Sequence, residues 1–149
     1  MRLTNYTSYA LRVLQYAALH DPHLCRVHDV ADAHGLSRAH VTKIVHELGQ
    51  AGLLETVRGR GGGFRLGRPA SQIRIGDVLR VTEGPLDLVE CFNPDTNTCR
   101  LIGICGLSEK LTEATQAFLE VLDSVTVADI SCNRGALMAR LGRLVPASG

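Results

Sequence analysis

Three of the chain's five cysteines, Cys91, Cys99 and Cys105, fall in one stretch that reads CFNPDTNTCRLIGIC. Seven residues separate the first two and five residues separate the last two, and the stretch shows neither helical nor strand-like periodicity. Thiols that gather in a loop can form a disulfide, bind a metal or act as redox-active groups. The residues around the cysteines indicate which of these three chemistries is favoured.

A disulfide would leave one thiol of the loop over, and the odd total of cysteines does not suit a closed disulfide framework. A structural zinc ion usually needs closely spaced cysteine pairs and a full set of protein ligands, and the loop contains neither such a pair nor a histidine. Iron–sulfur clusters accept thiolates at irregular spacings. The residues therefore favour a cluster with one open, reactive iron, and zinc or unliganded redox thiols are the alternatives.

Length and composition predict one domain, or one domain with an appendage. The chain has 149 residues, 45% of them apolar and none of them Trp. It has no long apolar run and no recognisable secretory signal, so we expect a cytoplasmic protein with reduced thiols and no membrane partner. Residues 1–70 hold nine Lys and Arg against five Asp and Glu, whereas residues 71–149 hold seven against ten. Unless this is random scatter, a basic front half indicates a surface for a polyanion.

The front half predicts a helix-turn-helix. An apolar face with helical spacing runs through residues 6–18, and Thr4 is its candidate N-cap. A short helix around Val30 ends at Gly35, and Ser37 is placed to cap the helix that follows. A short helix, a glycine turn and a second helix are the elements of a DNA-binding helix-turn-helix.

The second helix of this motif, residues 37–50, is the candidate recognition helix. Its apolar positions form a buried stripe, so the other side of its first turns is free to enter a major groove. Arginine can bind guanine bidentately, and histidine or lysine can reach a base edge or a phosphate. The predicted DNA contacts on this helix are Ser37, Arg38, His40 and Lys43.

Residues 54–66 predict a β-hairpin with a glycine-rich tip, the wing of a winged helix-turn-helix. Its arginines, Arg58, Arg60 and Arg65, are candidates for contacts with phosphates or the minor groove. A nucleotide-binding phosphate loop is disfavoured because no Lys-Ser or Lys-Thr pair follows the glycines. A protein-binding module with solvated arginines is the other alternative.

The rear half predicts a short helix from about Ile75, then the cysteine loop, then a long helix. Apolar residues of this helix recur in steps of three and four between Leu107 and Leu122. We expect the stripe to pair with a second copy in a homodimer, with packing on its own domain as the alternative. The predicted fold is mainly α with a small β-hairpin wing. Its parts are a winged helix-turn-helix domain (residues 1–84), a cluster-binding loop (85–106), and a dimerisation helix with a C-terminal tail (107–149).

Several motifs together resemble one known family. LETVRGRGGGFRLGRPASQIRIGDVLR followed by the three cysteines is similar to the iron–sulfur winged-helix repressors that include NsrR, IscR and RirA. The resemblance extends over residues 1 to about 130, and PASQIRIGDV, PLDLVEC and VTVADI are most similar to the nitric-oxide-sensing NsrR type. It implies a 4Fe–4S cluster on Cys91, Cys99 and Cys105 in a homodimeric, non-enzymatic repressor, which releases operator DNA when nitric oxide attacks the cluster.

The chain departs from the family pattern at the fourth ligand. Ser8 stands where NsrR-type chains usually have Asp, and Ser108 stands where IscR has His. The resemblance leaves Ser8, water, a carboxylate such as Glu90 or another group as candidates. The seven-residue gap before Cys99 is closer to RirA. A RirA-like repressor that responds to iron status, or a metal-free thiol repressor, are therefore the alternatives. Cys25 and Cys132 are expected to lie outside the site.

Overall fold

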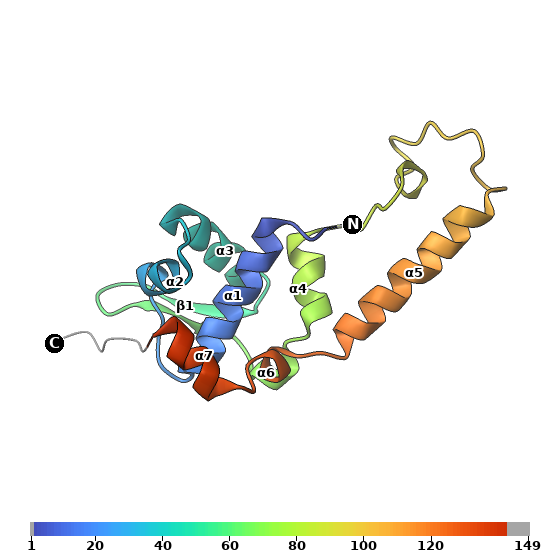
Figure 1. Ribbon diagram of the computed structural model, residues 1–149. Coiled ribbons are helices and arrows are strands. Elements are labelled where there is room, and N and C mark those ends of the chain that lie inside the picture. Colours follow the sequence, from blue (N-terminus) through green and yellow to red (C-terminus); the bar gives the residue numbers. More distant parts are fainter. Residues whose placement is uncertain (1, 143–149) are drawn as a thin grey trace.

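The computed structural model describes residues 2–142, and it consists of a packed head from which one long helix projects (Figure 1). The elements of the head, in chain order, are α1 (Asn5–His20), α2 (Val27–His34), α3 (Arg38–Gln50), β1 (Leu54–Val57), β2 (Gly63–Leu66), the 3-10 turn η1 (Ala70–Gln72) and α4 (Ile75–Thr82). The 3-10 turn η2 (Glu90–Phe92), α5 (Gly106–Asp123), α6 (Val127–Ile130) and α7 (Arg134–Leu141) follow.

Helix α1 is the centre of the head. Thr4 caps it as predicted, because its side-chain oxygen accepts a hydrogen bond from the backbone N–H of Thr7. The apolar face of α1 packs against α3, α4 and the wing, and its core residues are fully buried: Ala10, Val13, Leu14 and Ala17. An aliphatic core of this kind follows from the scarcity of aromatic residues in the chain.

The helix-turn-helix prediction is confirmed in its elements. Gly35 ends α2 with a φ of 63°, a left-handed conformation that glycine adopts without steric cost. Ser37 occupies the N-cap position of α3, although its hydroxyl makes no capping hydrogen bond with the described residues. The side of α3 that faces the core carries Val41, Ile44 and Leu48, all with no exposed surface. Burial of this stripe leaves the opposite side of α3 to solvent.

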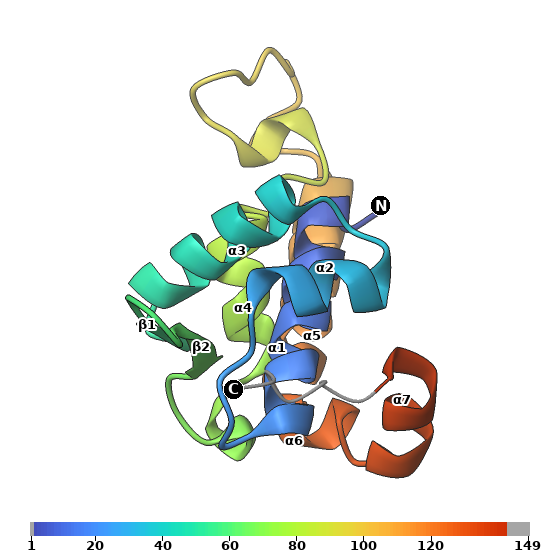
Figure 2. The ribbon, with the colours of Figure 1, turned by 90° about the vertical axis from the view of Figure 1, so that its left-hand side faces the viewer.

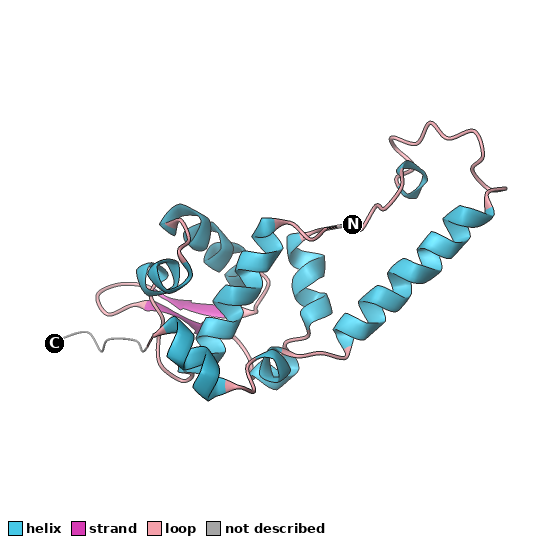
Figure 3. Cartoon of the chain, in the orientation of Figure 1, coloured by secondary structure: helices cyan, strands magenta, loops and turns pink. Residues whose placement is uncertain are grey.

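The wing is a two-stranded antiparallel sheet, the strands shown in magenta in Figure 3. Leu54 pairs with Leu66 at its base and Val57 pairs with Gly63 near its tip. The backbone of Cys25 exchanges hydrogen bonds of 2.7 and 2.8 Å with Phe64, which ties the segment before α2 to the second strand. The base of the wing is therefore part of the core, and its tip extends outward.

Helix α5 is attached to the head at its C-terminal end. Helix α4 lies between α1 and α5 (Figure 1). The guanidinium of Arg80 on α4 donates to both carboxylate oxygens of Asp123 on α5, at 2.7 and 2.6 Å. Gly76 allows this close approach, because a Cβ atom there would lie 1.9 Å from Asp123 Oδ1. We call Gly76, Arg80 and Asp123 the α4–α5 joint.

After α5 the chain returns to the head. The N–H of Val127 donates to the carbonyl of Ile73 at 2.9 Å, and the Val127 side chain is completely buried. Thr126 and Asp129 form a capping box at the start of α6. Val125 and Val127 thus pack with the core of the winged domain.

Residues 134–141 form α7, with Asn133 as its side-chain cap. No residue of α7 is fully buried; its apolar side chains Leu137, Met138 and Leu141 are half-buried. The remainder of the predicted tail, residues 143–149, lies outside the described residues. None of the described helices is long and apolar enough to cross a membrane.

The described residues cover little of the apolar stripe of α5, of which Phe118 and Leu122 pack against the core. None of the residues 106–123 is buried, and Leu107 and Val121 are each 63% exposed. Figure 2, turned by 90°, shows α5 behind α1, with the cysteine loop standing clear of the head. Packing of the stripe on its own domain is therefore limited to the neighbourhood of the α4–α5 joint.

Candidate functional site

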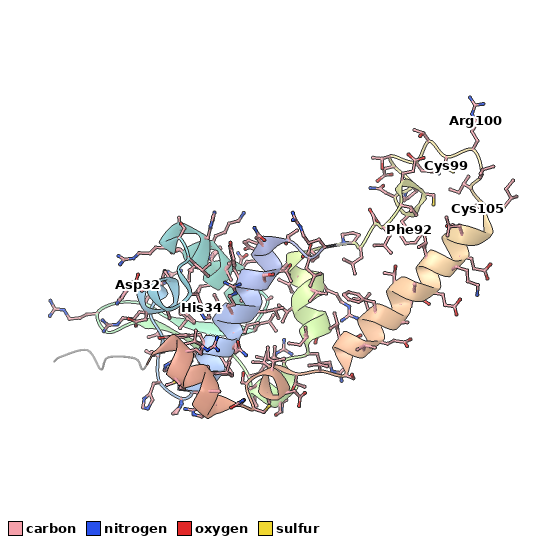
Figure 4. The ribbon with its side chains drawn as sticks, in the orientation of Figure 1. Asp32, His34, Phe92, Cys99, Arg100 and Cys105 are labelled. Atoms are coloured by element: carbon pink, nitrogen blue, oxygen red, sulfur yellow. The ribbon has the colours of Figure 1, made fainter. Side chains whose placement is uncertain are left out.

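The three loop cysteines line one small cavity at the far end of α5. Cys91 belongs to η2, Cys99 follows the turns of the loop, and Cys105 is the N-cap residue of α5. The cavity has a volume of about 160 Å³, and its other walls are largely apolar: Val89, Ile102, Leu107 and Leu111. Figure 4 shows Cys99 and Cys105 remote from the head, with Arg100 pointing away from the loop.

Asparagines and a carboxylate determine the course of the loop. Asn93 Oδ1 accepts from the N–H of Asp95 at 3.0 Å, and Asn97 Oδ1 accepts from the N–H of Cys99 at 2.9 Å. These are the local turns that asparagine side chains stabilise. The Glu90 carboxylate accepts from the Thr98 hydroxyl at 3.2 Å, which joins the two arms of the loop beside the cavity.

The donor set is suited to an iron–sulfur cluster in type and place. All three thiols are free and half-buried, and no histidine lines the cavity. Thiolates on an apolar wall are the usual ligands of such clusters, and the partial positive charge at the start of α5 favours a negatively charged group there. Among the described residues, no three His, Cys, Asp or Glu side chains already stand close enough to hold a metal ion. Binding would therefore draw the three sulfurs together.

The two other cysteines are placed as expected, outside the cavity. Cys25 is completely buried beside the wing, and burial raises the pKa of its thiol to about 12, so it stays protonated. Cys132 is exposed after α6. Neither thiol belongs to the loop site.

The candidates for a fourth ligand separate into two places. Glu90 and Ser108 line the same cavity as the cysteines, and the Cys91 thiol lies 3.6 Å from the Ser108 hydroxyl oxygen. Ser8 lies half-buried on α1 in the head and does not line the cavity of its own chain. The sequence comparison with IscR drew attention to position 108, but the contact of Ser108 with Cys91 could not be predicted from spacing.

The predicted DNA contacts at α3 are all exposed: Ser37 is its N-cap residue, and Arg38, His40 and Lys43 lie in its first two turns. Arg38 lies 3.7 Å from Asp32 of α2, an exposed pair that is readily exchanged for a phosphate or a base. The His40 ring is stacked 6.5 Å from the ring of Tyr9, and Lys43 Nζ lies 5.4 Å from the centre of the Tyr6 ring.

Tyr6 and Tyr9 lie on the apolar face predicted for residues 6–18. Both are half-buried and pack against the edge of the core. Tyr6 also donates a hydrogen bond to Glu47 of α3. The rings of Tyr6 and Tyr9 therefore contact side chains of the recognition helix α3. Tyrosines three residues apart at the margin of an apolar stripe are the signal that could have identified them.

The wing arginines are not equivalent. Arg58 and Arg60 are exposed at the tip, as a contact with DNA requires. Arg65 lies on the second strand, where its Nε donates to Glu55 Oε2 at 2.9 Å. This hydrogen bond lowers the pKa of Glu55, so the carboxylate stays charged and competes with DNA for Arg65.

Comparisons with known proteins agree with this arrangement. The Rrf2 family, described as iron-dependent transcriptional regulators, matches residues 3–133. The chain is 49% identical to the HTH-type transcriptional regulator NsrR of Shouchella clausii, over 95% of each chain. It is 44% identical to the NsrR of Bacillus subtilis, over 95% of this chain and 97% of the relative.

Solved structures confirm the predicted fold class. CymR, the global cysteine regulator of B. subtilis, has a TM-score of 0.73 at 27% identity, covering 89% of this chain and 97% of its own. IscR of T. potens has a TM-score of 0.72 at 25% identity, covering 96% and 93%. The sequence relatives are named as transcriptional regulators, which confirms the expectation of a DNA-binding regulator and not an enzyme. From its profile match, its relatives and its winged helix, the chain belongs to the Rrf2 family of transcriptional regulators.

Proposed function

We propose that this regulator is a homodimeric repressor that needs an iron–sulfur cluster, most simply 4Fe–4S, on Cys91, Cys99 and Cys105, and that nitric oxide is its signal. The observation that carries the proposal is the single cavity lined by three free, half-buried thiols. The cavity belongs to a chain that is 49% identical to a regulator named NsrR. The NsrR resemblance supports nitric oxide as the signal.

The residues of the loop would be ordered by ligation. Three sulfurs that share one cavity but are not yet at ligand separation must approach one another, which fixes residues 91–105 against the start of α5. A bound cluster would supply an iron that reacts with nitric oxide. When the cluster is lost, the loop returns to its open arrangement. The protein therefore has two states, which differ in how firmly residues 91–105 are held against the start of α5.

The path from the loop to DNA runs through packed elements. Helix α5 meets α4 at the joint of Arg80 and Asp123, α4 packs on α1, and α1 contacts α3. In a dimer joined through the exposed stripe of α5, the direction of each α5 sets the separation of the two recognition helices. A shift from nearly full to nearly empty operator needs a difference of roughly 5 kcal/mol between the states, which several metal–thiolate bonds can provide.

DNA contact is assigned to two groups of exposed side chains. Arg38, His40 and Lys43 on α3 would reach base edges in the major groove, with Ser37 at the start of the helix close to a phosphate. Arg58 and Arg60 at the tip of the wing would contact phosphates or the minor groove. Arg65 is assigned a weaker contribution because Glu55 already holds it.

A repressor that responds to iron status is the second candidate, favoured by the seven-residue gap between Cys91 and Cys99. A metal-free thiol repressor is a third, and it is consistent with free thiols that are not at ligand separation. These candidates share the same DNA-binding surface and differ in what the loop binds and which signal it answers.

The test is anaerobic purification followed by DNA binding. We expect a brown protein with iron and sulfide bound, and a colourless protein after replacement of all three loop cysteines by serine. An operator selected in vitro with the brown protein should be released when nitric oxide is added in stoichiometric amount. The Cys132→Ser variant, changed at an exposed thiol outside the loop, is the matched control and should behave as the parent.

Each alternative has its own outcome. Release by an iron chelator at a rate that matches cluster loss, without a response to stoichiometric nitric oxide, would favour the iron-status repressor. A colourless parent protein that binds its operator and responds to oxidants would show that the cluster proposal is wrong and that the thiols act alone.

A further inference from the structure

Ser108 stands in direct contact with one of the proposed ligands. It lies in the first turn of α5, three residues after Cys105, and its side chain lines the cavity that the three cysteines share. Its hydroxyl oxygen is 3.6 Å from Cys91 Sγ, a contact that connects η2 with the start of α5 across seventeen positions of sequence. Ser108 is half-buried, so water competes less for its hydroxyl than on an open helix face.

The other two hydroxyl residues of α5 behave differently. Thr112 and Thr115 donate to the carbonyls of Ser108 and Leu111, four residues earlier, at 2.9 and 2.8 Å. This local bond is the common choice for Ser and Thr within a helix. The Ser108 hydroxyl makes no such bond to a backbone carbonyl among the described residues. Its hydrogen-bond partner is the sulfur of Cys91. Its orientation is therefore not explained by the helix alone.

The direction of the hydrogen bond depends on the state of the sulfur. While Cys91 carries its proton, the S–H donates to the Ser108 oxygen. A sulfur that has lost its proton to become a ligand can only accept, and a hydroxyl can rotate to donate to it. Hydrogen bonds from neighbouring groups to ligand sulfurs orient the ligand and stabilise the more negatively charged state of a cluster.

We propose that Ser108 is a positioning residue, which donates a hydrogen bond to the Cys91 sulfur and thereby sets how firmly the cluster is held and how easily it is reduced. The inference rests on the proposed function and deepens it. Ser108 is assigned this role, and not that of a fourth ligand, because it already contacts a ligand sulfur.

The test compares three variants under anaerobic conditions. Ser108→Ala removes the hydroxyl, Ser108→Thr keeps it, and Thr112→Val removes a hydroxyl one turn further along the same helix. Iron and sulfide per chain report loading, the midpoint potential reports the hydrogen bond to sulfur, and the rate of cluster loss to a chelator reports retention. Circular dichroism confirms that each variant is folded.

We expect Ser108→Ala to load a full cluster, to lose it roughly tenfold faster than the parent, and to have a more negative midpoint potential. Ser108→Thr should restore both properties, and Thr112→Val should match the parent. Equal rates and potentials in Ser108→Ala and the parent would overturn the inference. So would a folded Ser108→Ala protein that cannot load, since that result would make Ser108 a ligand. A parent that binds no cluster would instead refute the proposed function, and this inference with it.

Discussion

Single residues of the same type have different roles in this protein, and their surroundings explain why. Arg60 is exposed at the tip of the wing, whereas Arg65 is paired with Glu55. Cys91 lines an open cavity, whereas Cys25 is sealed in the core. The sequence singled out these residues by their type and spacing. It could not distinguish between them, because pairing and burial depend on neighbours that are distant along the chain.

The wing arginines give the first prediction. Arg60→Ala should weaken operator binding and reduce the slope of log affinity against log salt by about one phosphate contact. Arg65→Ala should have a smaller effect, since its charge is already shared with Glu55. Binding measured across a salt series checks both. Identical losses for the two variants would show that Arg65 leaves Glu55 to contact DNA.

Arg38 gives a second prediction, because a base contact affects specificity and not only affinity. Arg38→Ala should relax the preference at one position of each half-site, at a cost of about 1–3 kcal/mol for the preferred base. Repeating the in vitro selection with the variant measures this preference. An unchanged preference would mean that α3 is not inserted in the groove as proposed.

Cys25 gives a third prediction, about stability. Cys25→Ser places a hydroxyl in a fully buried site and should lower the free energy of unfolding by about 1–3 kcal/mol. Cluster content should stay that of the parent, because Cys25 lies outside the loop. Thermal unfolding and iron content measured together check the prediction, with the exposed Cys132→Ser as control.

At the scale of elements, local patterns predicted most of the fold. Apolar periodicity located α1, α3, α4 and α5, and candidate capping residues marked the starts of α1 and α3. Two features were not predicted. Helix α7 is short and has no fully buried residue, and the return of Val127 to the core depends on backbone pairing with Ile73, which no periodicity reveals. The α4–α5 joint is likewise a tertiary contact, although a glycine within the α4 pattern hinted at a close approach.

The joint gives the fourth prediction. The hydrogen bond from Arg80 lowers the pKa of Asp123 below its ordinary value of 3.8. A carboxyl whose pKa is lowered by folding contributes stability above that ordinary value and loses it as the pH falls through the lowered one. The parent should therefore lose joint stability in acid, and Asp123→Asn should lack this component of the pH dependence. Thermal unfolding over an acid pH series checks it. Parallel pH profiles would contradict the assignment.

At the scale of the whole molecule, the exposed stripe of α5 is the surface on which the proposed dimer depends. A lone helix with an uncovered apolar stripe needs a partner, and a second copy is the expected one. Val121→Lys places a charge on the stripe and should shift the protein from dimer to monomer and weaken operator binding. Gln116 is exposed and lies on the side of α5 away from the stripe, so Gln116→Lys should leave the dimer intact. Sedimentation separates these outcomes, and a dimeric Val121→Lys would place the interface elsewhere.

Attachment of α5 at one end makes it a lever arm. Its eighteen residues give a length of about 27 Å, so a swing of roughly ten degrees at the Arg80–Asp123 pivot carries the thiol end through about 5 Å. Conversely, a closure of the cavity by a few ångströms at the end of α5 that carries Cys105 needs only a small rotation of α5 at the Arg80–Asp123 contact. Rotation of α5 about this contact would let the cysteine loop change the position of the recognition helix without unfolding any helix. The change would be reversed each time the cavity is occupied again.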